Sequence, residues 1–273
     1  MMSIRRVQAF QKKIYGHFEK YGRDFLWRRA RDPYQILVSE IMLQQTQTSR
    51  VEKKFPEFIK AFPDFITLAR APLSRVLAVW QGMGYNRRAI ALKKTTEIVI
   101  KKYKGKLPKS VETLDALPGI GVHTAGSIRA FAFNLPAVFI ETNIRTVFIH
   151  EFFLKRARVH DRALLPLVEQ TFDRANPRRW YYALMDYGVM LKKKHVNPSR
   201  RSAHYHAQSK FEGSHRQVRG MILKALVAEK NMSLPSLLKC MPTEPLRIRT
   251  AVRELQKEGF LKRKGDTIAI IED

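Results

Sequence analysis

Apolar residues recur at helical spacing along most of the chain. From about residue 7 to residue 190 they follow a period near 3.6, with proline and glycine as punctuation and without sustained strand-type alternation. The short apolar run at 137–140 is too brief to found a sheet. The pattern predicts helices at about 7–20, 34–48, 50–61, 73–79, 87–103, 111–116, 122–133, 143–152, 161–174 and 178–191. The body of the protein is therefore expected to be all-α.

The pattern changes near the C-terminus. Helices are predicted at about 216–229, 233–240 and 245–258, and two short alternating runs around Lys264-Gly265-Asp266 indicate a β-hairpin. Three helices and such a hairpin resemble a winged helix-turn-helix domain. Many winged helices bind proteins and others bind DNA, so the partner stays open. The helix expected to face a DNA groove carries Arg247, Arg249, Arg253 and Lys257.

Charge narrows the choice of partner. The 273 residues include 51 Lys and Arg against 24 Asp and Glu, a formal net charge of +27. A chain this basic is expected to bind a polyanion, with an affinity that falls steeply with salt. No apolar run approaches the length of a membrane span, and the N-terminus leads into an amphipathic pattern, which favours nucleic acid over a membrane. We expect a cytoplasmic protein, nucleoid-associated in a prokaryote.

The single cysteine and a run of basic residues also bear on the function. Cys240 stands alone, which excludes internal disulfides and thiolate clusters, and we expect no cofactor and no metal. Residues 192–219 hold eight Lys or Arg, one acid and four of the eight His. Such a run is typical of a solvated linker and equally of a segment that follows phosphates.

A proline-glycine turn at 117–121 separates two predicted helices. Two glycines without Cβ let a phosphate approach the backbone, and the N–H groups that open the next helix carry the positive end of its dipole. A helix-hairpin-helix of this kind holds a nucleic-acid backbone without reading its sequence. An ordinary helix connection closed by proline and glycine has the same pattern, so the turn alone leaves both interpretations open.

A single carboxylate interrupts the apolar helix that follows Asp32-Pro33. Glu40 has apolar residues on both sides and forms a narrow polar strip with Gln44 and Gln47, at i, i+4 and i+7. Desolvation should raise the pKa of this carboxyl, which suits a general acid. A solvent-facing Glu on a half-buried helix would give the same pattern.

Four segments together resemble a known family. Residues 39–47 (SEIMLQQTQ), 80–85 (WQGMGY), 117–121 (LPGIG) and 185–188 (MDYG) occur in the order seen in A/G-specific adenine DNA glycosylases of the MutY type. These enzymes belong to the helix-hairpin-helix base-excision superfamily. The similarity covers roughly residues 8–192, and its first segment is specific to the adenine branch.

The resemblance implies a mainly α, two-lobed helix-hairpin-helix DNA glycosylase fold followed by the small winged-helix-like domain. One lobe would comprise residues 1–27 plus 137–210, the other residues 28–136, and the C-terminal domain residues 211–273. The family acts on double-stranded DNA and flips the target base into the cleft between the lobes. We expect a monomer.

The resemblance also assigns roles. Glu40 would protonate adenine N7 and later handle the water, because adenine leaves poorly until a ring nitrogen is protonated and its departure leaves an oxocarbenium-like sugar. Asn143 would orient the Glu40 carboxyl. DNA contacts are expected from Gln44, Gln45, Thr46, Tyr85, Arg87, Gly119, Gly121, His123, Lys192, Arg200 and Arg201.

Two residues depart from the family pattern at the reacting centre. Glu141 stands where the family has an Asp that stabilises the cationic sugar, which moves the charge by about one methylene and implies slower catalysis or an adapted pocket. His123 stands where lyase-type relatives carry a Lys nucleophile, which favours a monofunctional glycosylase. His123 would bond the sugar or phosphate, or simply serve as a polar residue at a helix start.

A third departure is the missing metal centre. Relatives hold an iron–sulfur cluster with four cysteines after the MDYG segment, whereas here the first such position is about Lys192 and only Cys240 follows. The basic stretch from Lys192 to Lys210 would take the place of the cluster loop and its DNA contacts. The nucleotide-hydrolase-like domain that reads 8-oxoguanine in MutY-type enzymes is replaced by the shorter winged-helix candidate.

Three hypotheses follow from the sequence. The leading one is a glycosylase that removes adenine paired with 8-oxoguanine or guanine. A related enzyme for another mismatched or damaged base, such as thymine opposite guanine, is the first alternative. The second is a non-catalytic DNA-binding protein, which offers no reason for carboxylates at both Glu40 and Glu141.

Overall fold

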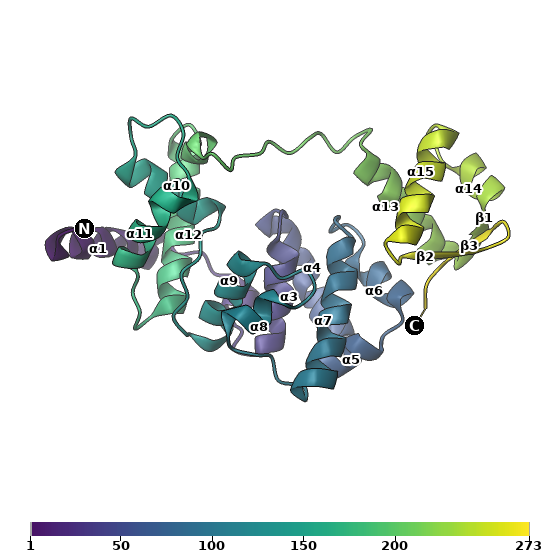
Figure 1. The fold of residues 1–273 in the computed structure, drawn as a ribbon, viewed down its shortest axis with the longest axis horizontal. Coiled ribbons are helices and arrows are strands. Elements are labelled where there is room, and N and C mark those ends of the chain that lie inside the picture. Colours follow the sequence, from purple (N-terminus) through teal and green to yellow (C-terminus); the bar gives the residue numbers. More distant parts are fainter. Residues whose placement is uncertain (1, 273) are drawn as a thin grey trace. The chain divides into compact units, whose positions relative to one another are not determined.

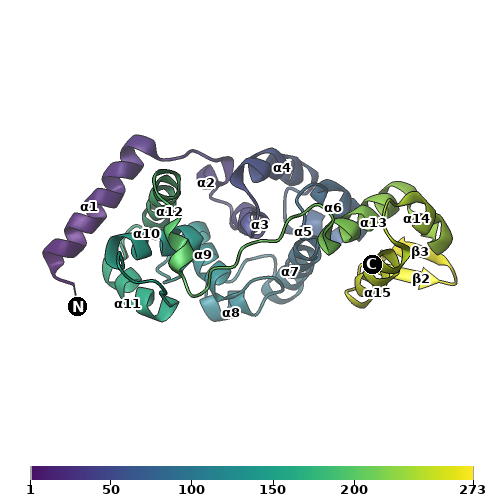
Figure 2. The same cartoon turned by 90° about the horizontal axis from the view of Figure 1, so that it is seen from above.

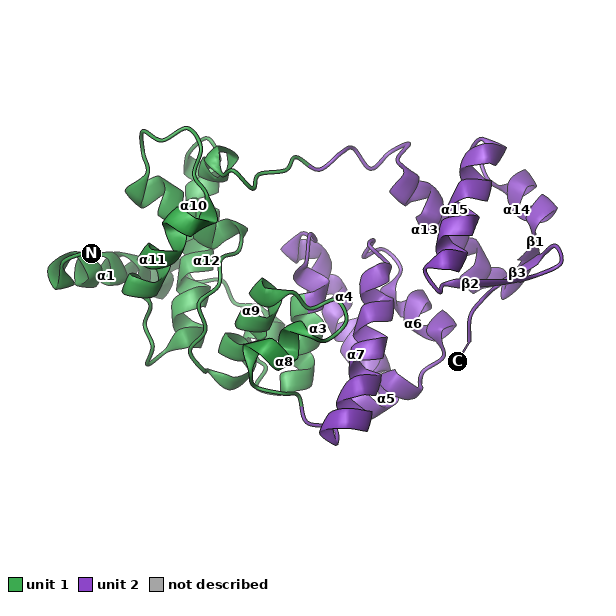
Figure 3. Ribbon diagram, in the orientation of Figure 1, with its two compact units in different colours: residues 1–40, 107–207 green, residues 41–106, 208–273 purple. Residues whose placement is uncertain are grey.

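The computed structural model describes residues 2–272, which divide into two compact units (Figure 3). Unit 1 comprises residues 1–40 and 107–207, and unit 2 comprises residues 41–106 and 208–273. The boundary falls inside one helix, directly after Glu40. This division does not test the predicted lobes (1–27 plus 137–210, and 28–136) or the domain at 211–273, which stay predictions.

Unit 1 is helical and buries its apolar stripes around α10 and α12, which lie side by side in Figure 1. Its core includes Ile14, Phe148 and Trp180. Gly188 lets α12 approach α10 closely, because a Cβ at this position would lie 2.5 Å from the Asn143 carbonyl oxygen. The elements that begin in this unit are α1 (Ile4–Tyr21), α2 (Leu26–Arg29), α3 (Pro33–Leu43), α8 (Val111–Asp115), α9 (Val122–Phe133), α10 (Thr142–Phe152), α11 (Asp161–Thr171), α12 (Pro177–Lys194) and the 3-10 helix η1 (Pro198–Arg201).

Unit 2 contains a second set of helices and a small sheet. Figure 2 shows α13, α14 and α15 beside the strands β2 and β3. The sheet has the order β1-β3-β2 and is antiparallel throughout, with Asn231 opposite Ala269 and Leu261 opposite Ile270. Its elements are α4 (Thr48–Ala61), α5 (Phe65–Arg70), α6 (Leu73–Trp80), α7 (Arg87–Tyr103), α13 (His215–Glu229), β1 (Asn231–Ser233), α14 (Leu234–Cys240), α15 (Pro245–Lys257), β2 (Leu261–Lys264) and β3 (Thr267–Ile270).

The helical fold class is confirmed, and so is the hairpin. Lys264 pairs with Thr267 across a two-residue turn in which Gly265 has φ +60°, a conformation that favours glycine. The element order α13-β1-α14-α15-β2-β3 follows the predicted helices and hairpin. The winged-helix assignment and its partner stay predictions. Among the described residues no helix is long and apolar enough to cross a membrane.

The predicted helix at 34–48 was wrong at its C-terminal end. The helix expected over 34–48 is α3, which ends at Leu43. Gln45 has φ +53°, which interrupts the helix. The polar strip of Glu40, Gln44 and Gln47 therefore does not form on one helix, because both glutamines lie beyond its end. The N-terminal part was right, since the Asp32 carboxylate accepts the N–H of Tyr34 at 3.0 Å.

Short elements account for most of the other differences. The helices α2 and α5, the 3-10 helix η1 and the strand β1 were not predicted, and each spans six residues or fewer. Such segments offer too few turns or alternations for periodicity to show. The helix predicted to end at residue 174 ends at Thr171.

Candidate active site

Glu40 lies in the last turn of α3, and the pKa of its carboxyl is raised. Burial raises the pKa of its carboxyl to about 7, and the Glu141 charge raises it further, while the Ser127 hydrogen bond and the Arg28 charge act in the opposite direction. The residue is half-buried, so solvent still reaches it. Near neutral pH both protonation states are populated, as an acid-base group requires.

Ser127, on α9, is the direct partner of this carboxyl. Its Oγ lies 2.5 Å from Glu40 Oε2 and 2.9 Å from the Thr124 carbonyl oxygen. A hydroxyl has one proton and also accepts. It can donate to an ionised Glu40, or accept from a protonated Glu40 while it donates to Thr124. This arrangement suits a carboxyl that changes its protonation state.

Glu141 is the N-cap of α10. Its Oε1 accepts the N–H groups of Asn143 at 2.7 Å and Ile144 at 2.9 Å. Its Oε2 accepts the Asn143 side-chain amide at 3.1 Å. Backbone donors at a helix start favour an anion. The longer side chain, in place of the family Asp, thus still places a carboxylate at the helix cap, within electrostatic range of Glu40.

Asn143 joins Glu141 to a second residue. Its Nδ2 donates to Glu141, and its Oδ1 accepts from Lys192 Nζ at 2.8 Å. In the described hydrogen bonds Asn143 thus binds Glu141. The role of Asn143 in orienting Glu40 stays a prediction.

Asp186 and two arginines form an ion cluster, and one of the arginines acts on Glu40 through its charge. Asp186, from the MDYG segment, is 3% exposed and accepts two hydrogen bonds from Arg28 and two from Arg23. The Arg28 guanidinium lies over the Tyr182 ring, 4.5 Å from its centroid. A buried carboxylate paired in this way holds Arg28 in place, and the Arg28 charge in turn acts on Glu40.

The predicted phosphate-binding turn lies between α8 and α9. Gly119 is exposed with φ +76°, so the turn requires a residue without Cβ. Gly121 is the exposed N-cap of α9, and His123 is exposed in the first turn of that helix. Since Ser127 lies one turn later in α9, the same helix carries the hairpin and the partner of Glu40.

In unit 2 four of the residues predicted to contact DNA lie on two loops. Gln44, Gln45 and Thr46 follow α3, and Tyr85 follows α6. Gln45 and Tyr85 have positive φ, +53° and +48°, which is uncommon for residues with a Cβ. Such strain persists only where the surroundings hold the backbone in place.

Arg88 holds both loops, and the sequence reasoning missed it. Its Nη1 donates to the carbonyl oxygens of Ile41, Met42 and Gln44 at 2.6–2.9 Å. Its Nη2 donates to Thr46 Oγ1 at 3.0 Å and to the carbonyl groups of residues 83 and 84 at 3.1–3.3 Å. The side chain is 8% exposed, and burial lowers its pKa to about 10. One guanidinium thus ends α3 and fixes the loop that carries Tyr85.

Three other residues predicted to contact DNA already have partners within the protein. The Tyr85 hydroxyl accepts from Arg216 at 2.5 Å, and the exposed Arg87 pairs with Glu258. Arg201 donates to the carbonyl groups of residues 153 and 154 at 2.6 and 2.7 Å, which closes the end of α10. Arg200 is exposed. The DNA-binding role of these residues stays a prediction.

Sequence reasoning missed Ser127 and Arg28 as well as Arg88. Ser127 offered no local signal, because it is one of two hydroxyl residues in a mostly apolar helix. Arg28 is one of four arginines at 23–31, and nothing in their spacing marks it as the one whose side chain is only 8% exposed.

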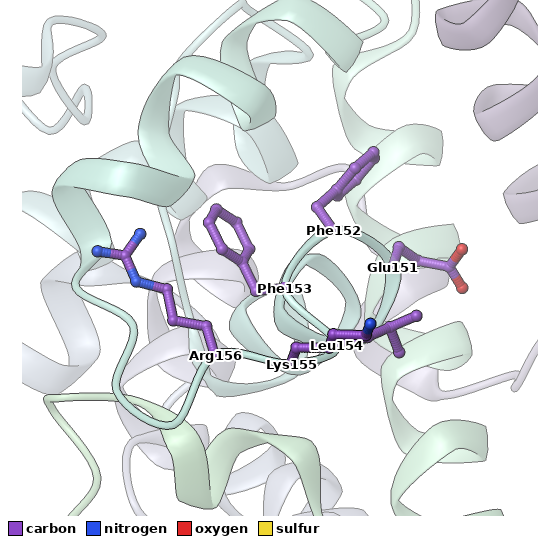
Figure 4. A pocket seen from close by; sticks show the side chains of 6 residues that line it. All are labelled: Glu151, Phe152, Phe153, Leu154, Lys155 and Arg156. Carbon is purple, nitrogen blue, oxygen red and sulfur yellow. The ribbon is translucent and has the colours of Figure 1, made fainter.

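A pocket near the far end of α10 does not overlap this site. It is lined by residues 151–156 (Figure 4). At 1.5 Å per residue, Glu151 is about 15 Å along the helix from Glu141. The pocket contains none of the predicted site residues.

The described residues also do not fit a metal centre. They include no group of three or more His, Cys, Asp or Glu side chains that could hold a metal ion. The single cysteine, Cys240, donates to the Leu237 carbonyl within α14. One thiolate cannot replace the four that an iron–sulfur cluster needs.

Comparison with known proteins agrees with the fold. Residues 38–170 match the family described as "HhH-GPD superfamily base excision DNA repair protein". The adenine DNA glycosylase of Buchnera aphidicola subsp. Baizongia pistaciae is 35% identical over 188 residues, which cover 67% of this chain and 53% of the relative. The thymine/uracil-DNA glycosylase of Methanothermobacter thermautotrophicus is 30% identical over 191 residues, which cover 68% and 86%. The chain spans about half the length of the adenine glycosylases first matched.

A solved structure shows the same likeness. The structure of a thermostable thymine-DNA glycosylase has a TM-score of 0.61 and 27% identity, covering 68% of this chain and 87% of that one. The mainly helical fold is therefore that of the helix-hairpin-helix glycosylases. The chain belongs to the HhH-GPD superfamily of base excision DNA repair proteins.

Proposed function

We propose that this protein is a monofunctional DNA glycosylase that extrudes a mispaired base from duplex DNA and hydrolyses its N-glycosidic bond. The observation that carries the proposal is the carboxyl pair of unit 1. Glu40 has a pKa of about 7, and Glu141 is held as a helix cap within electrostatic range. Two carboxyls in unlike environments take unlike roles in glycosidic cleavage.

The protonated Glu40 donates its proton to the leaving base, and the bond between C1′ and the base nitrogen breaks. The sugar then carries positive charge, which the Glu141 carboxylate stabilises. A water molecule adds to C1′ and returns one proton to Glu40, which leaves an abasic site and regenerates the acid. Catalysis therefore needs Glu40 protonated at the start, and the rate should fall as the pH rises above about 7.

Duplex DNA is the proposed substrate, bound by a monomer. A net charge of +27 favours a polyanion, and the exposed turn of Gly119 and Gly121 suits a phosphate at the start of α9. Tyr85 and Gln45 would enter the base stack from their two loops. The exposed residues Arg249 and Arg253 of α15 would add backbone contacts.

Adenine opposite 8-oxoguanine or guanine is the proposed target, supported by residues 39–47 and by the adenine glycosylase relatives. Thymine opposite guanine is the second candidate, supported by the thymine/uracil-DNA glycosylase, which the chain covers over 86% of its length. A panel of duplexes with A:8-oxoG, A:G, T:G and U:G pairs separates the candidates. After alkali treatment the strand that lost its base breaks, and the preferred pair breaks fastest.

His123 supports the absence of lyase chemistry, because no amine stands at that position to form a Schiff base. Borohydride added during the reaction should trap no covalent complex with DNA. A trapped complex, or strand breakage before alkali, would contradict the monofunctional assignment. Salt-sensitive binding without base release from any duplex would favour the non-catalytic alternative.

A further inference from the structure

Lys192 points into unit 1 instead of towards solvent. Its side chain is half-buried, and its Nζ donates to Asn143 Oδ1 at 2.8 Å. The next two residues of α12, Lys193 and Lys194, are exposed. Of these three lysines, Lys192 is therefore the one that the helix turns towards the carboxyl pair.

Gly188 explains how Lys192 reaches Asn143. A Cβ at Gly188 would lie 2.5 Å from the Asn143 carbonyl oxygen and 2.8 Å from its Cβ, so the α12 backbone touches the start of α10 there. Lys192 lies four residues later on the same face of α12. Its side chain therefore runs alongside that of Asn143, at the position where the family resemblance places a cluster cysteine.

The ammonium group determines which way the Asn143 amide faces. Lysine has donors and no acceptor, so it can bond only the amide oxygen. With Oδ1 turned to Lys192, Nδ2 faces Glu141 Oε2, 3.1 Å away. The two backbone N–H groups hold Oε1, so both oxygens of the Glu141 carboxylate are fixed. Without Lys192 the amide oxygen loses this partner, and the amide is held only by its bond to Glu141.

The charge of Lys192 also favours its place beside the Glu141 carboxylate. Burial lowers the pKa of Lys192, and the negative charge of Glu141 opposes that change, so the two groups lie within electrostatic range. Arg145 and Arg23 also act on Lys192 and favour its neutral form. The cation therefore balances part of the charge of the Glu141 carboxylate.

We propose that Lys192 is a positioning residue, which acts through Asn143 to hold the Glu141 carboxylate in the orientation that base excision needs. The inference rests on the proposed glycosylase function and replaces the phosphate contact expected for Lys192 from the sequence. The two roles differ in what they affect: a positioning residue changes the rate in the bound complex, and a phosphate contact changes affinity and its dependence on salt.

The test compares Lys192→Met with Lys193→Met, which removes the same charge from the adjacent exposed position. Base release is measured in single turnover at saturating enzyme, and duplex affinity is measured across a salt series. We expect Lys192→Met to slow release about 10- to 100-fold, the effect of losing a hydrogen bond to a charged group. Lys193→Met should not share this loss, and Lys192→Arg should restore part of the rate. An unchanged rate with a salt slope reduced by about 0.9 overturns the proposal in favour of a phosphate contact.

A double-mutant cycle with Asn143→Ala tests the route of the effect. If Lys192 acts through Asn143, adding Lys192→Met to Asn143→Ala should slow release less than about twofold further. Full additivity would show that Lys192 acts by another route. Thermal unfolding of each variant checks that the fold is intact.

A readout without activity separates this inference from the proposed function. The side-chain amide signals of Asn143 in a proton–nitrogen NMR spectrum should move in Lys192→Met and stay in place in Lys193→Met. Unmoved signals overturn the link between Lys192 and Asn143. If the wild type releases no base from any duplex, the proposed function fails, whatever the NMR spectra show for the link.

Discussion

Removing the Ser127 hydroxyl should extend activity to higher pH. The hydroxyl lowers the pKa of Glu40, whose value is about 7 with the hydroxyl present, so Ser127→Ala should raise it. A hydrogen bond to a charged group contributes about 1.5 to 3 kcal/mol, and the protonated carboxyl loses a partner too. The net shift should be about one pKa unit, or about 1.4 kcal/mol.

Single-turnover base release measured from pH 5 to pH 9 reports this shift. Because Glu40 must be protonated to act, the midpoint of the alkaline fall in rate should move from about 7 to about 8. Ser39→Ala is the matched control, since Ser39 precedes Glu40 and its hydroxyl donates to the Ile36 carbonyl instead. A midpoint that stays in place or falls in Ser127→Ala, or rises equally in Ser39→Ala, refutes the reasoning.

Three further predictions concern stability. Arg88→Met should cost about 3 kcal/mol, because buried carbonyl groups lose their donor, whereas the exposed Arg87→Met should change little in urea unfolding. Gly188→Ala should cost about 1 to 3 kcal/mol by steric overlap, whereas Gly16→Ala, with open space at its Cβ, should be stabilising in the same assay. Because the pKa of Glu40 is raised in the folded state, the free energy of unfolding of the protein falls as the pH rises from about 4.5 through 7. Glu40→Gln should therefore have a higher melting temperature than the wild type at pH 8, which corresponds to on the order of 1 kcal/mol in the free energy of unfolding because Glu40 is partly exposed. This difference should disappear at pH 5.

Local patterns predicted most of the helices because their apolar stripes persist over several turns. The helix start at Asp32-Pro33 and the turn at Gly265 follow from capping and backbone rules that act within a few residues. The end of α3 depends on Arg88, which comes more than forty residues later in the chain. No local pattern contains that information, which is why the helix was extended too far.

Some residues of the candidate site could be predicted from the sequence, and others depend on contacts between distant segments. Glu40 and Glu141 stand out in the sequence, because a carboxyl in an apolar helix and a family match each mark a position. Ser127 and the Lys192 bond to Asn143 depend on contacts between helices far apart in the chain. The sequence placed Lys192 in a basic run and so indicated a phosphate contact, whereas its direction depends on the packing that Gly188 permits.

The central claim is that Glu40 acts as the acid in base excision. The most direct test incubates excess wild-type protein and the Glu40→Gln variant with duplexes that carry A:8-oxoG, A:G or T:G pairs, followed by alkali. We predict breakage at the mispaired base with the wild type, and intact strands with Glu40→Gln, which should still bind the duplex. Intact strands with the wild type on every duplex, or equal breakage by both proteins, would contradict the account.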